Sequence, residues 1–415
     1  MSAKSILLVS HELSRSGAPS SLLRQARYLC EAGYRVVVWT LADGPLGNSF
    51  RSLGVAVVCV GSDFSEVRRR VRSEGADFAL VVCNTYKTYR YATAFAAAGR
   101  PVAWFIRETA NLLGPLASDR EFAQALRGFY NLYTVSAYAR DYIASINPHV
   151  RYFNNSVEDR FSAFSSMKPS EIRFGFIGAI TKRKGIADLI SAYCALPPSP
   201  VTTSLRIAGR FEGTEEGTRL RRLTAGRPDV IWLGEVAGST REEFFNSVDV
   251  LCVPSRDEPS GLTLLEGAMY GKALLATDHV GANYVIGEAN GIVVPVSDIG
   301  RGLQSFLNRV EDLAAMQMES RQRYLHLATP ELERDEVLKM VLENLENPPP
   351  PGTMEVRPVR QFFRKEDVGE THWRFRIWGV PVLKCRKISW LKCFIRWVLV
   401  GMGVDPGRLG YATEE

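Results

Sequence analysis

The feature that most constrains the fold is an alternation of short apolar runs with longer helical segments along most of the 415-residue chain. Short apolar runs bounded by glycine, proline or polar residues are typical of buried strands. The predicted strands are residues 5–10, 35–40, 55–60, 78–83, 102–106, 132–135, 172–176, 204–208, 230–233, 250–253 and 273–276. Such alternation with helices predicts an α/β fold with parallel sheets covered on both faces.

The length of the chain and a polar break near residue 165 divide this alternation into two series. We therefore predict two doubly wound, Rossmann-like domains at residues 1–165 and 166–330. A further helix is predicted at 331–346, and it must end at the prolines of 348–351 because proline cannot continue a helix. Ligands bind beyond the carboxyl ends of such strands, so the two domains are expected to face each other across a cleft.

A strand-to-helix junction in the second series carries two glutamates. The apolar run that ends at Pro254 is followed by a loop with Glu258 and by a helix that opens at Gly261 and carries Glu266. Side chains of a helix lean towards its N-terminus, so both carboxylates can reach the space beyond the strand. The alternative is that both are solvated, but this helix is apolar almost all round, so Glu266 needs a polar partner.

The same junction offers backbone amides for an anion. Gly261, Leu262 and Thr263 begin the helix, where N–H groups lack a preceding turn and the positive end of the dipole favours phosphate. A phosphate site beside two hydroxyl-binding carboxylates suits a nucleotide sugar.

At these residues the sequence resembles the retaining GT-B glycosyltransferases of family 4, whose signature is Glu-Pro-Phe-Gly-Leu-x-x-x-Glu-Ala. Here it stands as Glu-Pro-Ser-Gly-Leu-Thr-Leu-Leu-Glu-Gly, with Ser260 and Gly267 as the departures. The resemblance implies a GT-B fold and no cofactor beyond a nucleoside-diphosphate sugar as donor substrate. It also implies that Glu258 binds hydroxyls of the donor sugar, that Glu266 binds the ribose, and that Ser260 lies at the donor.

A second segment, Phe176-Ile-Gly-Ala-Ile-Thr-Lys-Arg-Lys-Gly185, resembles the family's Gly-Arg-Leu-x-x-x-Lys-Gly loop. In that loop an arginine and a lysine grip the donor diphosphate. Lys184 matches the lysine, whereas Ala179 stands where the arginine is usual, so Arg183 or Lys182 must supply the second cation. The alternative is a solvated basic turn.

The first series offers weaker candidates. Gly17 precedes a helix after the first strand, where a small residue lets amides approach an anion, although a plain connection would look the same. Arg107 stands at a strand end where many family members carry a histidine. It could support the reacting sugar, bind an anionic acceptor, or pair with Glu108 as a structural ion pair. Residues 84–87, at another strand end, are a further acceptor-side candidate.

Charge is concentrated in a C-terminal tail at 352–415. The net charge is +6, but Arg357 to Trp397 alone carries +8, which leaves −2 elsewhere and argues against nucleic acid as a partner. Within the tail, 373–384 alternates like a strand and resembles a segment of bacterial surface-polysaccharide transferases. Residues 388–400 have the spacing of an interfacial amphipathic helix for an anionic membrane, unless its aromatic residues pack on the protein itself.

These observations predict a retaining glycosyltransferase that moves a sugar to a hydroxyl of a glycan or lipid-linked acceptor in polysaccharide biosynthesis. No two aspartates stand two residues apart, so the Asp-x-Asp element of metal-dependent sugar transferases is absent and metal independence is predicted. The short polar N-terminus and scattered cysteines predict a cytoplasmic protein, and the basic aromatic tail predicts a peripheral position on the inner face of the membrane. The alternatives are an inactive glycosyltransferase-like binding or scaffold subunit, motivated by Ala179 and Arg107, and a sugar-nucleotide isomerase.

Overall fold

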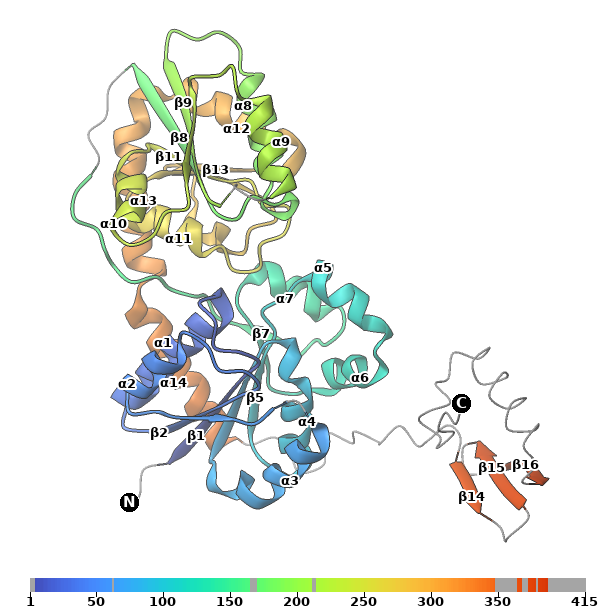
Figure 1. Ribbon diagram of the computed structural model, residues 1–415. Helices are drawn as coiled ribbons and strands as arrows, with labels where there is room; N and C mark the ends of the chain where they lie inside the picture. The colour runs from blue at the N-terminus through green and yellow to red at the C-terminus, as the bar shows by residue number, and fades with distance from the viewer. Residues whose placement is uncertain are drawn as a thin grey trace. The chain divides into compact units, whose positions relative to one another are not determined.

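The computed structural model describes residues 4–61, 63–164, 170–210 and 214–347, together with the backbone of 364–367, 372–377 and 380–386. The chain divides into two compact units, Met1–Met354 and Glu355–Glu415. The first unit contains two parallel sheets, each covered by helices (Figure 1).

Within the described residues, seven parallel strands form the first sheet: β1 (Ser5–Ser10), β2 (Arg35–Thr40), β3 (Ala56–Cys59), β4 (Leu80–Asn84), β5 (Val102–Phe105), β6 (Leu132–Thr134) and β7 (Arg151–Tyr152). The helices between them are α1 (Gly17–Glu31), α2 (Gly47–Ser52), α3 (Phe64–Glu74), α4 (Tyr89–Ala97), α5 (Ala110–Leu113), α6 (Arg120–Gly128) and α7 (Ala137–Ala144). The strand order is β3-β2-β1-β4-β5-β6-β7, so the order reverses between β1 and β4.

The first sheet is apolar on both faces, which explains its continuous hydrophobic runs. Ile6 and Leu8 of β1 pack on one face with α1, whereas Leu7 and Val9 pack on the other with α3, α4 and α6. All four side chains are fully buried. Because side chains alternate along a strand, helices are needed on both faces to keep this strand from water.

The second sheet repeats this plan. Within the described residues its six parallel strands are β8 (Glu171–Ile177), β9 (Thr202–Ala208), β10 (Val230–Gly234), β11 (Val250–Val253), β12 (Ala273–Thr277) and β13 (Gly291–Val294). Its helices are α8 (Ile186–Cys194), α9 (Glu215–Leu223), α10 (Ser239–Asn246), α11 (Leu262–Met269), α12 (Ile299–Leu307) and α13 (Leu313–Leu327). The order is β10-β9-β8-β11-β12-β13, with a reversal between β8 and β11.

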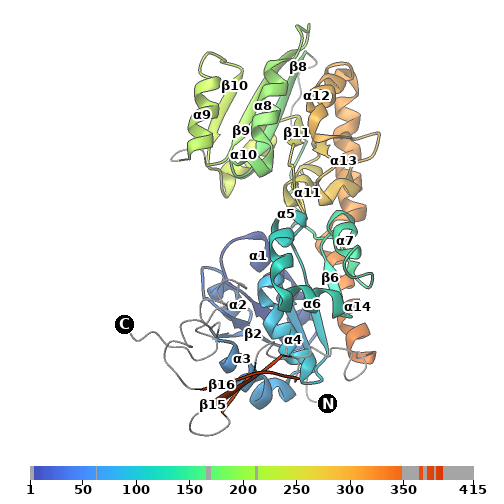
Figure 2. The ribbon, with the colours of Figure 1, turned by 90° about the vertical axis from the view of Figure 1, so that its right-hand side faces the viewer.

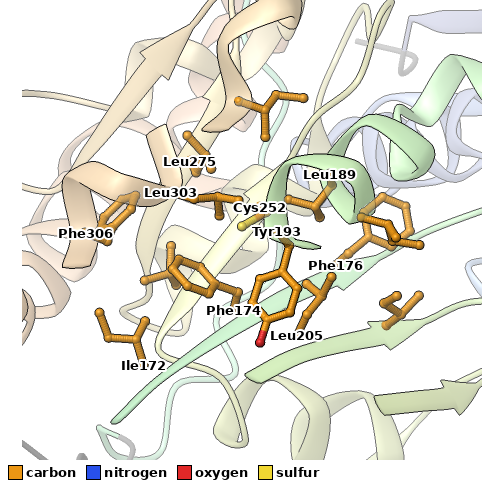
Figure 3. Packing of buried hydrophobic residues seen from close by; sticks show 14 of the residues in the cluster. Ile172, Phe174, Phe176, Leu189, Tyr193, Leu205, Cys252, Leu275, Leu303 and Phe306 are labelled. Carbon is orange, nitrogen blue, oxygen red and sulfur yellow. The ribbon is translucent and has the colours of Figure 1, made fainter. Parts of the chain in front are cut away.

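Figure 3 shows the core on one face of the second sheet. Phe174 of β8 lies among side chains of α8, α12 and the neighbouring strands, with Tyr193 and Phe306 edge-on to its ring. The predicted fold class, two doubly wound α/β domains, is confirmed.

The last helix of the first unit, α14 (Pro330–Glu346), packs against α1 and β4 of the first sheet (Figures 1 and 2). Glu333 of α14 is almost fully buried and accepts two hydrogen bonds from Arg24 of α1, at 2.9 and 3.1 Å. It also accepts the backbone amide of Ser156 at 3.2 Å. The helix that follows the second sheet is therefore anchored to the first.

Two strands differ from the sequence-based expectation. β7 is only two residues long and exposed, whereas β13 has a short apolar run at 292–294 that opens with a glycine after a polar turn. The second unit contains an antiparallel sheet of β14 (Arg364–Asp367), β15 (His372–Ile377) and β16 (Val380–Arg386), so the backbone is extended where alternation predicted a strand. The predicted helix at 388–400 lies outside the described residues. Among the residues searched, none of the helices combines the length and apolarity needed to cross a membrane.

Candidate active site

Two loops at the carboxyl ends of β8 and β11 are pressed together at Gly185. This residue caps the start of α8 with φ of +68°, and a Cβ built on it would lie 1.8 Å from the carbonyl oxygen of Pro254. Only glycine tolerates both the left-handed backbone and this approach. The contact brings the short helix Lys182–Lys184 beside the loop that carries Glu258.

Glu258 lies between both cations of the predicted diphosphate loop. Its Oε2 accepts a hydrogen bond from Lys184 Nζ and lies 3.3 Å from Nη1 of Arg183. The other oxygen, Oε1, receives the backbone amide of Gly261 at 3.4 Å. The structure thus brings together four residues that the sequence predicted for one site, and the carboxylate occupies the place next to the helix N-terminus where an anion is favoured.

The backbone around Glu258 is held on both sides. Its amide donates to the carbonyl of His279 at 3.0 Å, and its carbonyl accepts from Gly281 at 2.8 Å. The amide of Arg256 donates to the carbonyl of Arg183 at 2.8 Å, which ties the loop again to the cationic segment. The position of Glu258 is therefore set by backbone bonds as well as by its own side chain.

Glu266 lies in α11 and has the polar partner that its surroundings require. Arg241 of α10 donates to it through Nε, at 2.9 Å, and through Nη2. The sequence analysis did not single out Arg241. It stands outside every recognised motif and 25 residues before its partner, so no local signal marks it.

The remaining residues of the predicted donor site surround the start of α11. Gly261 caps this helix with φ of +80°, and the amides of Leu262 and Thr263 belong to its first turn. Ser260 accepts a hydrogen bond from Asn155 Nδ2 at 2.7 Å, and Asn155 also accepts one from Ser21 of α1 at 3.2 Å. The serine that replaces the signature phenylalanine therefore joins the two halves of the first unit.

Arg107 is buried at the carboxyl end of β5, with 9% of its surface exposed. Its Nε donates to Asn84 Oδ1, and its guanidinium lies 5.2 Å from the ring centre of Phe105. Among the described residues, its Nη2 has no hydrogen-bond partner. Burial, reinforced by the charge of Arg24, lowers the pKa of Arg107 to about 10.

Glu108 does not form the side-chain pair with Arg107 that one interpretation suggested. Its Oε2 instead accepts two backbone amides, from Arg107 at 2.9 Å and from Tyr86 at 3.3 Å. Burial raises the pKa of Glu108 to about 7, because the charged form loses its hydration.

Gly17 opens α1, and Asn84 links this region to Arg107. Asn84 Nδ2 donates to the carbonyl of Ala18 at 3.0 Å while its Oδ1 accepts from Arg107. The next residue, Thr85, has φ of +74°, a conformation that costs free energy in a residue with a β-branched side chain. Strained residues of this kind cluster at functional sites, and Thr85 directly follows β4, which lies between β1 and β5 in the sheet.

Asp257 is a residue that the sequence analysis missed. It is 3% exposed and accepts hydrogen bonds from three residues of the first half: Thr109 Oγ1 at 2.5 Å, Asn111 Nδ2 at 2.7 Å and Tyr138 Oη at 3.2 Å. Thr109 follows Arg107 by two residues, and Asp257 directly precedes Glu258. This carboxylate therefore connects the two groups of predicted site residues.

Comparison with known proteins gives two matching family models. Family models described as "Glycosyl-transferase family 4" and "Glycosyl transferases group 1" match residues 2–118 and 171–314. The uncharacterized glycosyltransferase MJ1607 from Methanocaldococcus jannaschii is 31% identical over 152 residues, which are 36% of this chain and 39% of that protein. Glycogen synthase of Mycobacterium tuberculosis is 25% identical over 309 residues, 70% of each chain.

Among solved structures, Anabaena Alr3699/HepE in complex with UDP and glucose superposes with a TM-score of 0.67 at 15% identity, covering 82% of this chain and all of that one. Two doubly wound sheets of this order define the GT-B fold. The chain has the GT-B fold and is a glycosyltransferase, and the family 4 model matches within its first half and the group 1 model within its second.

Proposed function

We propose that this protein is a retaining, metal-independent glycosyltransferase that moves a sugar from a nucleoside-diphosphate sugar to a hydroxyl of a glycan or lipid-linked acceptor. The observation that carries the proposal is the group formed by Glu258, Lys184 and Arg183 at the start of α11. It places two cations, helix amides and a hydroxyl-binding carboxylate within one hydrogen-bonded set.

Each member of this set has a task in the proposed reaction. Lys184, Arg183 and the amides of α11 stabilise the negative charge that develops on the leaving diphosphate. One preorganised donor of this kind contributes about 3 to 4 kcal/mol in well-studied sites. Glu258 binds hydroxyls of the donor sugar, and Glu266 binds the ribose. The departing phosphate accepts the proton of the acceptor hydroxyl, and the lack of an Asp-x-Asp element supports a reaction without metal.

The acceptor is expected to bind on the first half, near Arg107 and Lys87. The unpartnered nitrogen of Arg107 and the exposed side chain of Lys87 support an acceptor with a negatively charged group.

The basic tail supports a membrane-bound acceptor. The protein with its tail should therefore sediment with anionic liposomes at low salt, whereas a chain ending at Pro350 should remain in the supernatant. Equal sedimentation of the two proteins would contradict membrane binding by the tail.

The central experiment combines calorimetry with transfer assays. Wild-type protein should bind UDP, GDP or ADP, and Glu266→Ala should weaken that binding. Glu258→Ala should bind the diphosphate at least as well as wild type but lose sugar transfer. Equal losses of nucleotide affinity in both variants would contradict the assignment of Glu266 to the ribose and of Glu258 to the donor sugar.

The role of Lys184 and the independence of the reaction from metal ions are tested separately. Lys184→Ala should lower kcat/KM by about 100-fold or more, because one transition-state charge is removed. EDTA should leave the activity unchanged, and an enzyme that is silenced by EDTA and restored by Mg²⁺ would contradict metal independence. Nucleotide binding without donor hydrolysis or transfer to any of a panel of acceptors would favour a binding subunit.

A further inference from the structure

The first sheet has a hollow of 490 Å³ at the end opposite to the candidate active site. It is lined by residues that directly precede β6, by residues at the start of β7 and by the last turns of α14. Because the strands are parallel, their amino ends meet at this end of the sheet, whereas Arg107 and Thr85 follow the carboxyl ends of β5 and β4. The volume lies in the range of small-molecule sites.

Asn147 holds two sides of this hollow together. It is fully buried, and its Nδ2 donates to the carbonyls of Leu126 and Phe129, at 2.8 and 2.7 Å. Its Oδ1 accepts the backbone amide of His149 at 2.9 Å. These bonds fix the turn before β6 beside the turn before β7, so the hollow is formed before any ligand binds.

Exposed aromatic rings form one wall of the hollow. Tyr130 is 50% exposed, and its ring centre lies 5.5 Å from that of His149, which is also exposed. The C–H groups of a pyranose form an apolar face, and an aromatic ring can cover that face while the tyrosine hydroxyl remains free to form a hydrogen bond.

Two buried amide groups in the hollow each have an atom without a hydrogen-bond partner within the described residues. Asn131 Oδ1 accepts from Arg151 Nη2 at 3.1 Å, which leaves its Nδ2 as an unpaired donor. Asn344 Nδ2 donates to the carbonyl of Met340 at 2.8 Å and to Tyr133 Oη at 3.0 Å, which leaves its Oδ1 as an unpaired acceptor. The two side chains are 4% and 1% exposed. A buried polar atom without a partner is unfavourable, so a ligand that pairs with these atoms is favoured.

The cation of the hollow is already neutralised. Arg151 Nη1 pairs with a carboxylate of α14 at 2.8 Å, and its guanidinium lies 4.5 Å from the ring centre of Tyr133. An anionic ligand would have to compete with this ion pair. A neutral ligand with several hydroxyls suits the hollow better, because each hydroxyl both donates and accepts a hydrogen bond.

We propose that this hollow is a second saccharide site, which binds part of a glycan away from the residues that transfer the sugar. The inference goes beyond the proposed function, and only the identity of that glycan as the acceptor rests on it. A long acceptor that is held at both places binds more tightly than a short one, because its second contact is intramolecular.

The test is direct binding by calorimetry, without nucleotide, of linear oligosaccharides of glucose, galactose, mannose, rhamnose or N-acetylglucosamine. Wild type should bind at least one of them. Tyr130→Ala should lower the affinity for that oligosaccharide about tenfold, because the stacked ring is lost, whereas Tyr130→Phe keeps the ring and should retain most of the affinity. In transfer assays Tyr130→Ala should raise KM for a long acceptor and leave kcat, and KM for a monosaccharide acceptor, unchanged.

Tyr152 of β7 provides a matched control. It is a second exposed tyrosine, at 38%, but the guanidinium of Arg140 lies 5.0 Å from its ring centre and covers the ring. It lines a different hollow. Tyr152→Ala should therefore leave the affinity for the oligosaccharide unchanged. Thermal unfolding establishes that each variant is folded, and His149→Ala, which removes the other ring of the wall, decides the question if Tyr130→Ala is not.

The outcomes separate the inference from the proposed function. If wild type binds none of the oligosaccharides, or if Tyr130→Ala and His149→Ala bind them as tightly as wild type, the second saccharide site is wrong while sugar transfer is untouched. If the two variants lose binding but the wild-type protein transfers no sugar, the saccharide site stands and the proposed function is wrong.

Discussion

Glu258 cannot pair with the cations Lys184 and Arg183 and bind the donor sugar at the same time. In the structure it forms ion pairs with Lys184 and Arg183, which are the cations proposed for the diphosphate. A diphosphate that reaches these cations replaces the carboxylate as their counter-ion. Donor binding and the release of Glu258 towards the sugar are then one event, and the free carboxylate competes with the ligand.

Removing this competitor should therefore strengthen nucleotide binding. Glu258→Gln should bind the preferred nucleoside diphosphate about two- to fivefold more tightly, the worth of a partly exposed ion pair, while transfer is lost. Calorimetry measures the affinity and a product assay measures transfer. The control is Glu343→Gln, which removes the negative charge of a glutamate on α14 that pairs with Arg151 of β7. It should change neither nucleotide affinity nor transfer. Weaker binding by Glu258→Gln would show that the carboxylate helps to hold the diphosphate site together.

Glu108 gives the stability of the protein a pH dependence of its own. Its pKa is raised from 4.5 to about 7 by burial, so between these values the folded state holds a proton that the unfolded state has released. The unfolded state binds fewer protons, and the free energy of unfolding must fall as pH rises through this window. The expected loss is about 3 kcal/mol.

Glu108→Gln should remove this loss, because glutamine can still accept the two backbone amides but does not titrate. Urea unfolding of both proteins between pH 4.5 and 7 measures the difference curve. The difference is needed because burial lowers the pKa of His11, whose effect has the opposite sign. Parallel curves for the two proteins would contradict the raised pKa.

At the scale of elements, the strands that the sequence predicted are those that contain an apolar run, and they include β3 and β10, which are only partly buried. β7 and β13 were missed because one is short and exposed and the other begins at a glycine after a polar turn. The helix start at Gly261 was predicted because strand, loop and helix are contiguous in the chain. Arg241 could not be found in this way, since its pairing with Glu266 depends on how two helices pack.

The contact between Gly185 and Pro254 joins two elements that carry the site, and a methyl group there should separate them. Gly185→Ala faces both a φ of +68° and a carbonyl oxygen at 1.8 Å, so we expect a loss of at least about 2 kcal/mol in stability and a fall in transfer. Gly33→Ala is the control. Gly33 has φ of +84° but, within the described residues, no atom within 4 Å of the added methyl group.

The difference between these two alanine variants isolates the close approach from the backbone strain that both share. Chemical denaturation measures stability, and kinetics measure transfer. A Gly185→Ala protein that is no less stable than Gly33→Ala would show that the loops can separate at no cost.

For the whole molecule, the link between Thr109 and Asp257 couples the two halves at the site. The residues are 148 positions apart in the sequence, and neither belongs to a motif that predicts a contact with the other. Their pairing could therefore not be predicted from the sequence. Thr109→Val keeps the shape of the side chain and removes the hydrogen bond to a buried carboxylate, which should cost about 1.5 to 3 kcal/mol. Transfer should fall while nucleotide affinity is unchanged, because Lys184, Arg183, Glu266 and the amides of α11, which carry the proposed nucleotide contacts, lie in the second half.

Thr134→Val provides the matched control. The hydroxyl of Thr134 is buried in β6 and, in the part of the chain that the structure describes, has no hydrogen-bond partner. Its replacement by a methyl group should be neutral or stabilising. If the two valine variants behave alike in denaturation and in kinetics, the link through Asp257 does not couple the halves.

The position of Asp257 directly before Glu258 also bears on how an activated sugar survives in water. The hydrogen bonds from Thr109, Asn111 and Tyr138 hold the loop that carries Glu258 against the first half, so we expect a donor sugar to be bound but not set for reaction where these bonds are removed. We expect the enzyme to hydrolyse little of its donor when no acceptor is bound. The rate of donor hydrolysis should therefore depend on these hydrogen bonds and not only on how much donor is bound.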